Sequence, residues 1–293
     1  MNKVSIYGGL GNQMFQYALC RALNKRGKKA RLSFPNFFYH HYRFDLGRAF
    51  HIKFAFPFNL LRFILLHGEI FYKNRLANRV SRRLIEWYQS KVYTLYAEKI
   101  EFEYDGNVFE EDAVFFKGVW QVEQYFKDIK TVLLQEFVFK PPVDKENIAV
   151  IEKINNCNAV SIHIRRGDYL HSHWAKSLGV IKDLSYYIRS IDYINEHTTE
   201  PHFFIFSDDI QWVKENLQLA NCTYVGHNSG TNSYVDMYLM SLCKHNIIAN
   251  STFSWWGAWL NKHDDKIVIM PEKWMNDNAC PGIFPQEWIK MKV

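Results

Sequence analysis

The sequence has little cysteine and arranges none of it in pairs. Five cysteines occur among 293 residues, at positions 20, 157, 222, 243 and 280, and no two of them form a CxxC pair. An odd number of scattered cysteines argues against a disulfide framework, and the missing CxxC spacing argues against a structural zinc site. We therefore expect the chain to work in a reducing compartment.

Long hydrophobic runs are also missing. The first residues, MNKVSIYGGLGNQ, lack the apolar core of a signal peptide, and nowhere do about 18 apolar residues follow one another. The most apolar stretch, residues 54–71, is interrupted by Pro57 and Arg62 and precedes the basic run at 73–83. We interpret it as a buried helix; the alternative is an interfacial helix that meets anionic lipid through its basic neighbours.

Two common signatures of nucleotide and metal binding are absent. The chain has no GxxxxGK[ST] loop, and GGLGNQ matches GxGxxG only loosely because no third glycine follows. Asp208 and Asp209 are adjacent rather than spaced as DxD, and His171 and His173 have no evident third ligand. We expect no bound metal and no cofactor.

Charge and aromatic content leave the partner open. The formal net charge is +6 and is spread along the chain, while aromatic residues make up 17% of it. That charge is modest for a protein that binds nucleic acid, and it suits an anionic small molecule or lipid headgroups equally well. The basic residues also do not gather in one stripe with interleaved aromatics. A non-catalytic protein that binds nucleotides or single-stranded nucleic acid remains an alternative.

The order of predicted elements indicates an α/β fold. Residues 3–7 read as a strand, a glycine-rich turn follows, MFQYALCRALNKRG has helical spacing, and KKARLSF resumes as a strand. Two prolines followed by charged residues at 139–147 predict a boundary between domains at 1–140 and 141–293. Beyond it, strands and helices alternate from NAVSIHI to a last strand at KIVIM, which predicts a second doubly wound domain.

Polar residues follow several of the predicted strands in this second domain. HIRRGD follows NAVSIHI, SDD follows the next strand, and NSTFS follows NIIAN and opens a helix. Carboxyl ends of parallel strands meet at one edge of a sheet, where ligands bind. Paired arginines and free N–H groups at a helix start bind phosphate. The residues expected to converge are Arg165, Arg166, Ser207, Asp208, Asp209, Asn250, Thr252 and Ser254.

Five motifs together resemble one enzyme family. HIRRGDY resembles the HxRRxD signature of the α1,2-fucosyltransferases and their α1,6- and protein O-fucosyltransferase relatives. GGLGNQMFQYA, FKGVWQVEQYF, FSDD and NSTFSWWGAWL resemble the bacterial α1,2 members in order and spacing. The resemblance covers most of the chain and is weakest at 36–100. It implies a GT-B arrangement, in which two Rossmann-like domains face a cleft and the second binds GDP-β-L-fucose.

The resemblance also implies roles for single residues. Arg165 would contact the β-phosphate and neutralise the departing GDP, with Thr252 and Ser254 donating to the phosphates. His163 and Asp236 would lie near the guanosine. Candidates for the base that accepts the proton are His163, Asp168 and a residue of the first domain. Gly9, Asn12 and Gln13 match the first-domain loop that faces the sugar and the acceptor.

The implied reaction is an inverting transfer of L-fucose to the 2-hydroxyl of a terminal β-galactoside, without a required metal. The implied acceptor is a galactose-terminated oligosaccharide or lipid-linked glycan of a bacterial surface polysaccharide. A fucosyltransferase of another linkage is an alternative, because its donor motifs would be alike. We expect a cytoplasmic enzyme, with peripheral contact to the inner membrane as a further expectation.

Overall fold

The computed structural model describes residues 1–33, 44–52, 91, 94–112, 114–167, 169 and 175–293. The sequence predictions that concern Asp168, His171, His173 and the 54–83 stretch lie outside the described residues. The chain divides into two compact units, Met1–Lys140 and Pro141–Val293. The division falls at Pro141–Pro142, where the sequence changes from an aromatic segment to a charged one.

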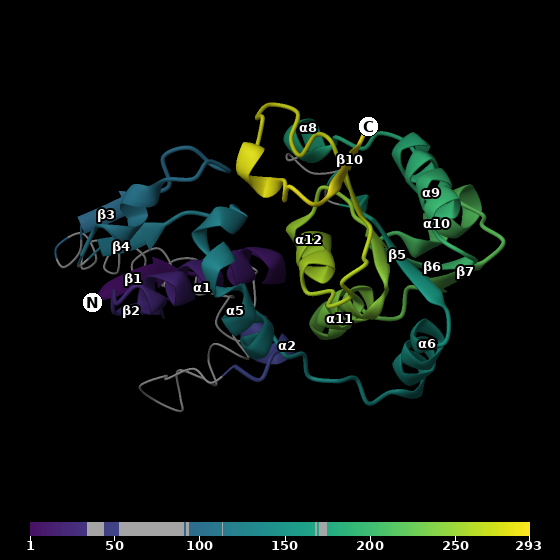
Figure 1. Ribbon diagram of the computed structural model, residues 1–293, viewed down its shortest axis with the longest axis horizontal. Helices are drawn as coiled ribbons and strands as arrows, with labels where there is room; N and C mark the ends of the chain where they lie inside the picture. Colours follow the sequence, from purple (N-terminus) through teal and green to yellow (C-terminus); the bar gives the residue numbers. More distant parts are fainter. Residues whose placement is uncertain (34–43, 53–90, 92–93, 113, 168, 170–174) are drawn as a thin grey trace, which may run out of the picture. The chain divides into compact units, whose positions relative to one another are not determined.

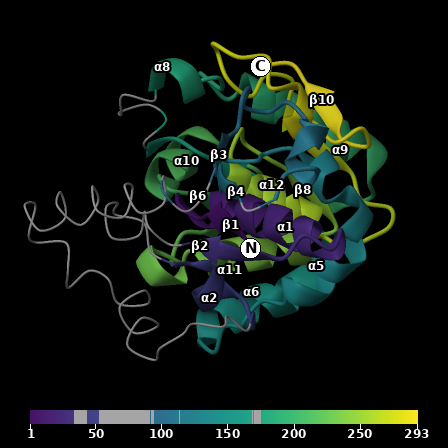
Figure 2. The ribbon, with the colours of Figure 1, turned by 90° about the vertical axis from the view of Figure 1, so that its left-hand side faces the viewer.

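Unit 1 is built on a parallel sheet. Its described strands are β1 (Asn2–Ser5), β2 (Ala30–Ser33), β3 (Thr94–Ala97) and β4 (Val114–Lys117), in the order β2-β1-β4-β3 (Figures 1 and 2). Helix α1 (Leu10–Lys25) connects β1 to β2 and buries Phe15, Leu19 and Leu23 completely. The short α-helices α2 (Leu46–Ala49) and α5 (Lys130–Glu136) also belong to this unit, together with three 3-10 turns between residues 106 and 129.

Helix α1 begins earlier than its hydrophobic spacing predicts. The pattern places its start at Met14, but the helix begins at Leu10, directly after the Gly8–Gly9 turn. Gly8 has φ +80°, and a Cβ there would lie 2.7 Å from Asn12 Nδ2, so the tight turn requires glycine. The polar segment Gly11–Gln13 is therefore the first turn of the helix rather than part of a loop.

Unit 2 has a six-stranded parallel sheet in the Rossmann strand order. Its strands are β5 (Asn158–Ile164), β6 (Pro201–Ser207), β7 (Cys222–Val225), β8 (His245–Ile247), β9 (Val268–Pro271) and β10 (Ile289–Met291). They are ordered β10-β9-β8-β5-β6-β7, so the winding direction reverses between β5 and β8. The strand predicted at KIVIM is confirmed as β9, but it is not the last strand, because β10 follows it after a long segment without strands.

The helices of unit 2 cover both faces of this sheet. The helices packed on it are α6 (Lys145–Asn155), α9 (Ser185–His197), α10 (Ile210–Asn216), α11 (Tyr234–Leu242) and α12 (Thr252–Trp259) (Figure 1). The short α8 (Ala175–Leu178) buries no side chain. Ile162 and Ile205 pack against α9 and α10, whereas Phe204 and Phe206 pack against α6 and α11. The strands are buried on both faces, which explains why NAVSIHI and PHFFIFS are almost continuously apolar.

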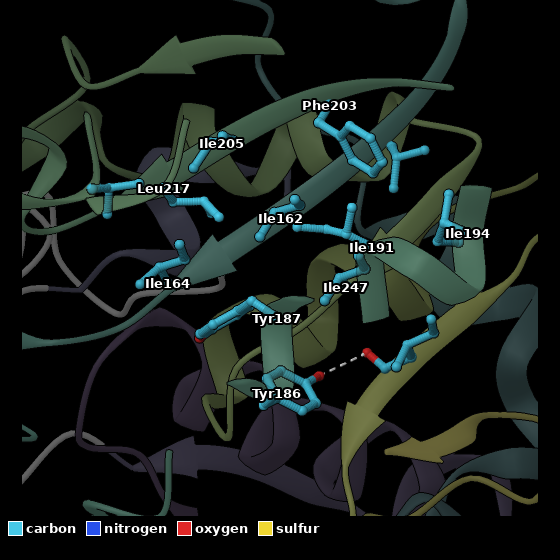
Figure 3. Close-up of a cluster of buried hydrophobic side chains, with 13 residues drawn as sticks. Ile162, Ile164, Tyr186, Tyr187, Ile191, Ile194, Phe203, Ile205, Leu217 and Ile247 are labelled. Carbon is cyan, nitrogen blue, oxygen red and sulfur yellow. Dashed lines mark hydrogen bonds between the residues drawn. The ribbon is translucent and has the colours of Figure 1, made fainter. Parts of the chain in front are cut away.

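The α9 face of the core contains two buried tyrosines (Figure 3). Tyr186 donates its phenol hydrogen to the carbonyl oxygens of Ile248, at 2.6 Å, and Ile269, at 3.3 Å. Tyr187 donates to the carbonyl oxygen of His163 at 3.1 Å. The carbonyls of His163 and Ile248 lie near the end of β5 and just beyond β8, whereas that of Ile269 lies within β9. The two hydroxyl groups therefore attach α9 to the sheet where β5 and β8 end.

The two units thus confirm the predicted α/β class with two Rossmann-like halves, as a GT-B transferase has. Throughout the ranges given above, every helix is too short or too polar to cross a membrane.

Candidate functional site

Three segments of unit 2 converge at the carboxyl ends of β5, β6 and β8. They are residues 165–167 and 169 after β5, residues 207–209 at the end of β6, and residues 250–254 after β8. Tyr169 Oη donates to the carbonyl oxygen of Asn250 at 3.1 Å, and the rings of His163 and Phe253 lie 5.8 Å apart. This is the place where the strand order reverses, which is where doubly wound sheets bind ligands.

Arg165 lies at the centre of this convergence. Its Nε is 3.3 Å from Asp208 Oδ2, and its guanidinium carbon lies 5.6 Å from the centre of the Tyr169 ring. About a third of the side chain is exposed. A guanidinium that is held by a carboxylate and an aromatic ring, and still reaches solvent, is positioned to receive an anionic ligand.

Asp208 holds the backbone after β5 as well as the arginine. Its carboxylate accepts from the N–H of Arg166 at 2.9 Å and from the N–H of Gly167 at 3.0 Å. A Cβ on Gly167 would lie 2.7 Å from Asp208 Oδ2, so this approach requires glycine. The glycine of HIRRGD is therefore explained by its close contact with the acid of FSDD.

The side chain of Arg166 lies on the face of the sheet opposite to that of Arg165, against α10. Its Nε lies 3.2 Å from Asp209 Oδ2, and its guanidinium carbon lies 3.3 Å from the centre of the Trp212 ring on α10. Asp209 also caps α10 by accepting from the N–H of Trp212, and its own N–H donates to Ser207 Oγ. Ser207, Asp209 and Arg166 thus form a structural group at the start of α10.

His163 lies on the same side of β5 as Arg165. Its side chain is buried, with 5% exposed, and its Nδ1 has no hydrogen-bond partner. Burial, and secondarily the charge of Arg165, lowers the pKa of His163 to about 3. The imidazole is therefore neutral at physiological pH, so it can form hydrogen bonds with a ligand but is a weak proton acceptor.

The start of α12 forms the third side of the site. Ser251 caps the helix by accepting from the N–H of Phe253, and Thr252 is the first helical residue. Asn250 and Ser254 lie close by, but both are buried. Asn250 Nδ2 donates to the carbonyl oxygens of Leu178 and Trp274.

The hydroxyl of Ser254 also turns towards the backbone, where it donates to the carbonyl oxygens of Ala249 and Ser251. Of the predicted phosphate donors in this segment, Thr252 is the half-buried one, at the helix end itself. The tryptophans of SWWGAW are buried in the core rather than presented to a ligand; Trp255 Nε1 donates to the carbonyl oxygen of Ile283.

Asp236 lies on the first turn of α11. Burial raises its pKa to about 7, although Asn228 Nδ2 donates to Asp236 Oδ1 at 2.8 Å and opposes that rise. Asn228 also exchanges hydrogen bonds with Asn147, whose amide contacts Asp144 at the start of α6. The carboxyl of Asp236 is therefore held by a network that reaches the first helix of unit 2.

Of the three unit 1 residues predicted to face the sugar and the acceptor, one, Gln13, has a structural role, and the other two are Gly9 and Asn12. Gln13 is fully buried, donates to the carbonyl oxygen of Gly8, and accepts from the N–H groups of Asp45 and Leu46. Its side chain is structural in this arrangement. Gly9 has open space around its Cα, and Asn12 Oδ1 accepts from Gln121 Nε2 at 3.0 Å.

Sequence reasoning missed two residues that the structure adds to the site, Tyr169 and Trp212. Both could have been found from the sequence, because Tyr169 directly follows the RRGD segment and Trp212 lies one helical turn after Asp209. In the part of the chain that the structure describes, no three His, Cys, Asp or Glu side chains gather as metal ligands.

Comparison with known proteins identifies the family. The model of "Glycosyl transferase family 11" matches residues 83–292. The O-antigen biosynthesis glycosyltransferase WbnK of Escherichia coli is 31% identical, over 97% of this chain and 98% of its own. An α-1,2-colitosyltransferase of Escherichia coli is 32% identical over 97% of each chain. Human galactoside α-(1,2)-fucosyltransferase 1 is 31% identical over 44% of this chain and 35% of its own.

Solved structures resemble the chain more remotely. The α-1,6-fucosyltransferase NodZ, soaked with GDP-fucose, is 14% identical with a TM-score of 0.47, over 88% of this chain and 91% of its own. Heptosyltransferase II of Escherichia coli is 10% identical with a TM-score of 0.48, over 100% of this chain and 89% of its own. The fold class rests on the strand orders given above, and the family rests on the sequence matches. Since the family model covers more than half of the chain and a full-length relative exceeds 30% identity, the chain belongs to glycosyl transferase family 11 and is a glycosyltransferase.

Proposed function

We propose that the enzyme transfers L-fucose from GDP-β-L-fucose to the 2-hydroxyl of a terminal β-galactoside, with inversion at the anomeric carbon. The observation that carries the proposal is the position of Arg165, which is partly exposed at the reversal of strand order. Its guanidinium faces the ring of Tyr169, whose hydroxyl donates to Asn250 just before α12. The names of the relatives support an α1,2 linkage and a place in the synthesis of a bacterial surface polysaccharide.

The chemistry requires charge stabilisation at the leaving group. The fucose C1–oxygen bond breaks, and its electron pair stays on the β-phosphate of GDP. The acceptor oxygen bonds to C1 from the opposite face and releases its hydroxyl proton to a base or to solvent. Negative charge therefore grows on the phosphate in the transition state. A fixed guanidinium stabilises that charge more in the transition state than in the ground state, which accelerates the reaction.

Other residues receive binding roles in this proposal. The N–H groups at the start of α12 and the Thr252 hydroxyl would donate to the diphosphate. His163 and Asp236 would bind the guanosine, since the neutral imidazole has an unpartnered nitrogen and the Asp236 carboxyl is held in place by Asn228. Arg166, Ser207 and Asp209 would support the segment that carries Arg165 rather than touch the donor.

Metal independence belongs to the same proposal. Arg165 and the positive end of α12 supply the charge that a divalent cation supplies in other diphosphate-dependent transferases. The proposed acceptor is a galactose-terminated oligosaccharide or lipid-linked glycan, and contact with the membrane surface would follow from a lipid-linked acceptor.

GDP-colitose is a second candidate donor, because the colitosyltransferase relative is as similar as the others. Colitose is fucose without its 3-hydroxyl. A site that forms hydrogen bonds with that hydroxyl would reject colitose strongly, because its polar groups would be left unpaired.

The test is incubation of the purified enzyme with either donor and lactose, followed by linkage analysis of the product. We expect fucose linked α1,2 to galactose and little transfer of colitose. Another linkage would contradict the proposed linkage, and preferred transfer of colitose would contradict the proposed donor. No transfer of either sugar to lactose would contradict the proposed acceptor class.

A further inference from the structure

Unit 1 contains a cavity of about 260 Å³ at the carboxyl ends of β3 and β4. One wall is the loop after β3, residues 98–106, and the other is formed by Trp120 and Tyr125, which follow β4. The strands β3 and β4 are parallel neighbours, so both end at the carboxyl edge of this sheet. The cavity therefore occupies the edge of the sheet where α/β folds bind ligands.

An aromatic wall lines part of the cavity. The rings of Tyr104 and Tyr125 have their centres 5.0 Å apart, and Tyr125 meets Trp120 edge to face at 5.8 Å. Trp120 and Tyr125 are fully buried, but Tyr104 is 39% exposed. A partly exposed ring supported by two buried ones offers a rigid apolar surface, which suits the C–H face of a sugar ring.

Carboxylates line the polar part of the cavity. Three acidic side chains, Glu98, Glu103 and Asp105, line the cavity, compared with one basic side chain, Lys99. Asp105 accepts from Tyr96 Oη at 2.6 Å and lies 3.2 Å from Lys99 Nζ. This excess of negative charge repels a diphosphate, whereas carboxylate oxygens accept hydrogen bonds from the hydroxyl groups of a neutral sugar.

The turn beside the cavity is held in a strained conformation. Trp120 has φ +58° and Phe102, on the opposite loop, has φ +66°, which are uncommon for residues other than glycine. Glu98 fixes the Trp120 turn by accepting from the N–H groups of Val119 at 2.7 Å and Trp120 at 3.1 Å. Strain of this kind is found where a fold positions groups for a ligand.

Two further observations point to a ligand. The indole Nε1 of Trp120 is buried and has no hydrogen-bond partner, which costs free energy unless a ligand or water satisfies it. Burial raises the pKa of Glu98 to about 7, against the opposing effect of the N–H groups of Trp120 and Val119. Near neutral pH this carboxyl can both accept and donate hydrogen bonds, as sugar hydroxyls require.

We infer that this cavity binds a neutral sugar ring of the acceptor glycan, with Tyr104 as its stacking surface. The inference rests on the proposed function and adds the place where the acceptor is held. It makes Tyr104 a specificity-determining residue for the acceptor and gives it no role towards the donor.

The test uses the full chain and the variants Tyr104→Ala, Tyr104→Phe and Leu95→Ala. Leu95 is the matched control, since it is 59% exposed on β3 next to Tyr96 but does not line the cavity. Saturation-transfer NMR with lactose measures acceptor binding without any donor, and initial rates with GDP-fucose give the KM of each substrate. Circular dichroism confirms that each variant is folded.

We expect Tyr104→Ala to abolish the saturation-transfer signal of lactose and to raise the acceptor KM at least tenfold, while the GDP-fucose KM changes less than twofold. Tyr104→Phe, which keeps the ring, and Leu95→Ala should behave as the wild type does. Equal lactose binding by the wild type and Tyr104→Ala, or no binding by the wild type, would overturn the inference. The NMR result stands apart from transfer, so failure of the cavity and failure of the proposed fucosyl transfer are distinguishable.

Discussion

Asp208 forms a single carboxylate bridge between Arg165 and the backbone that follows β5. One oxygen lies 3.3 Å from Arg165 Nε, and the two oxygens accept from the N–H groups of Arg166 and Gly167. The guanidinium is thereby fixed relative to the end of its own strand. Preorganisation of this kind is what makes a charged group effective against charge that develops during bond cleavage.

We predict that Asp208→Asn lowers kcat roughly tenfold, because the amide cannot hold the guanidinium as a carboxylate does. The affinity for GDP should stay the same or rise, since a negative charge near the diphosphate is removed. Steady-state rates and calorimetric titration with GDP measure the two effects. A tenfold loss of GDP affinity with unchanged kcat would contradict the positioning role of Asp208.

Arg166→Ala should affect stability more than transfer. The side chain contacts Trp212 and Asp209 on α10, and the loss of a cation–π contact and an ion pair costs about 1–2 kcal/mol. We expect a lower midpoint of urea unfolding and a rate of transfer within threefold of the wild type at 25 °C. A hundredfold loss of transfer without a stability change would place Arg166 on the donor instead.

The strand alternation behind this contrast could be predicted from the sequence. In NAVSIHI the side chains alternate between two buried faces, and the alternation continues far enough to separate Arg165 from Arg166. Five of the six strands of unit 2 could also be predicted, all but β10, because each lies in or beside an apolar segment that a helix or turn signal follows. The strand β3 at 94–97 was missed, since its side chains are mostly exposed and no pattern marks them.

The side-chain directions within the site could not be predicted in the same way. Asn250 and Ser254 lie in the expected segment, yet their polar groups satisfy buried carbonyl oxygens. Gln13 likewise lies in the expected turn but braces the backbone around Gly8 and Asp45. A motif places a residue at a strand end or helix start, whereas its hydrogen bonds depend on segments far away in the sequence.

The stability of the enzyme should depend on pH through Asp236. Its pKa of about 7 lies above the ordinary value of 3.8, so the fold favours the neutral form and loses stability as pH rises between these values. We predict that Asp236→Asn removes this loss, so that the variant gains up to about 3 kcal/mol relative to the wild type between pH 5 and pH 8.

Urea unfolding at the two pH values measures the effect, and Asp192→Asn, at an exposed position on α9, is the control. If the free energies of unfolding of Asp236→Asn and the wild type differ by the same amount at both pH values, the Asp236 carboxyl is already ionised in the folded enzyme at pH 5. That result would contradict the raised pKa of Asp236.

Transfer should persist without divalent metal. We expect the rate of transfer from GDP-fucose in EDTA to stay within twofold of the rate in magnesium, because Arg165 and the start of α12 neutralise the diphosphate. The measurement is the initial rate after dialysis against EDTA, with manganese and magnesium added back in parallel. Loss of turnover in EDTA that either metal restores would contradict this account of leaving-group stabilisation.

The central claim concerns Arg165, and single-turnover transfer from GDP-fucose by its variants tests it most directly. Arg165→Ala removes a group that acts on developing charge, which costs roughly 3–4 kcal/mol, or a factor of about 10² to 10³ in turnover. Arg165→Lys should recover little of this, because an ammonium cannot reproduce the planar contact to phosphate oxygens. With circular dichroism confirming the fold, the account predicts slow transfer by both variants and near-normal transfer by Arg166→Ala. Near-normal transfer by Arg165→Ala would contradict it.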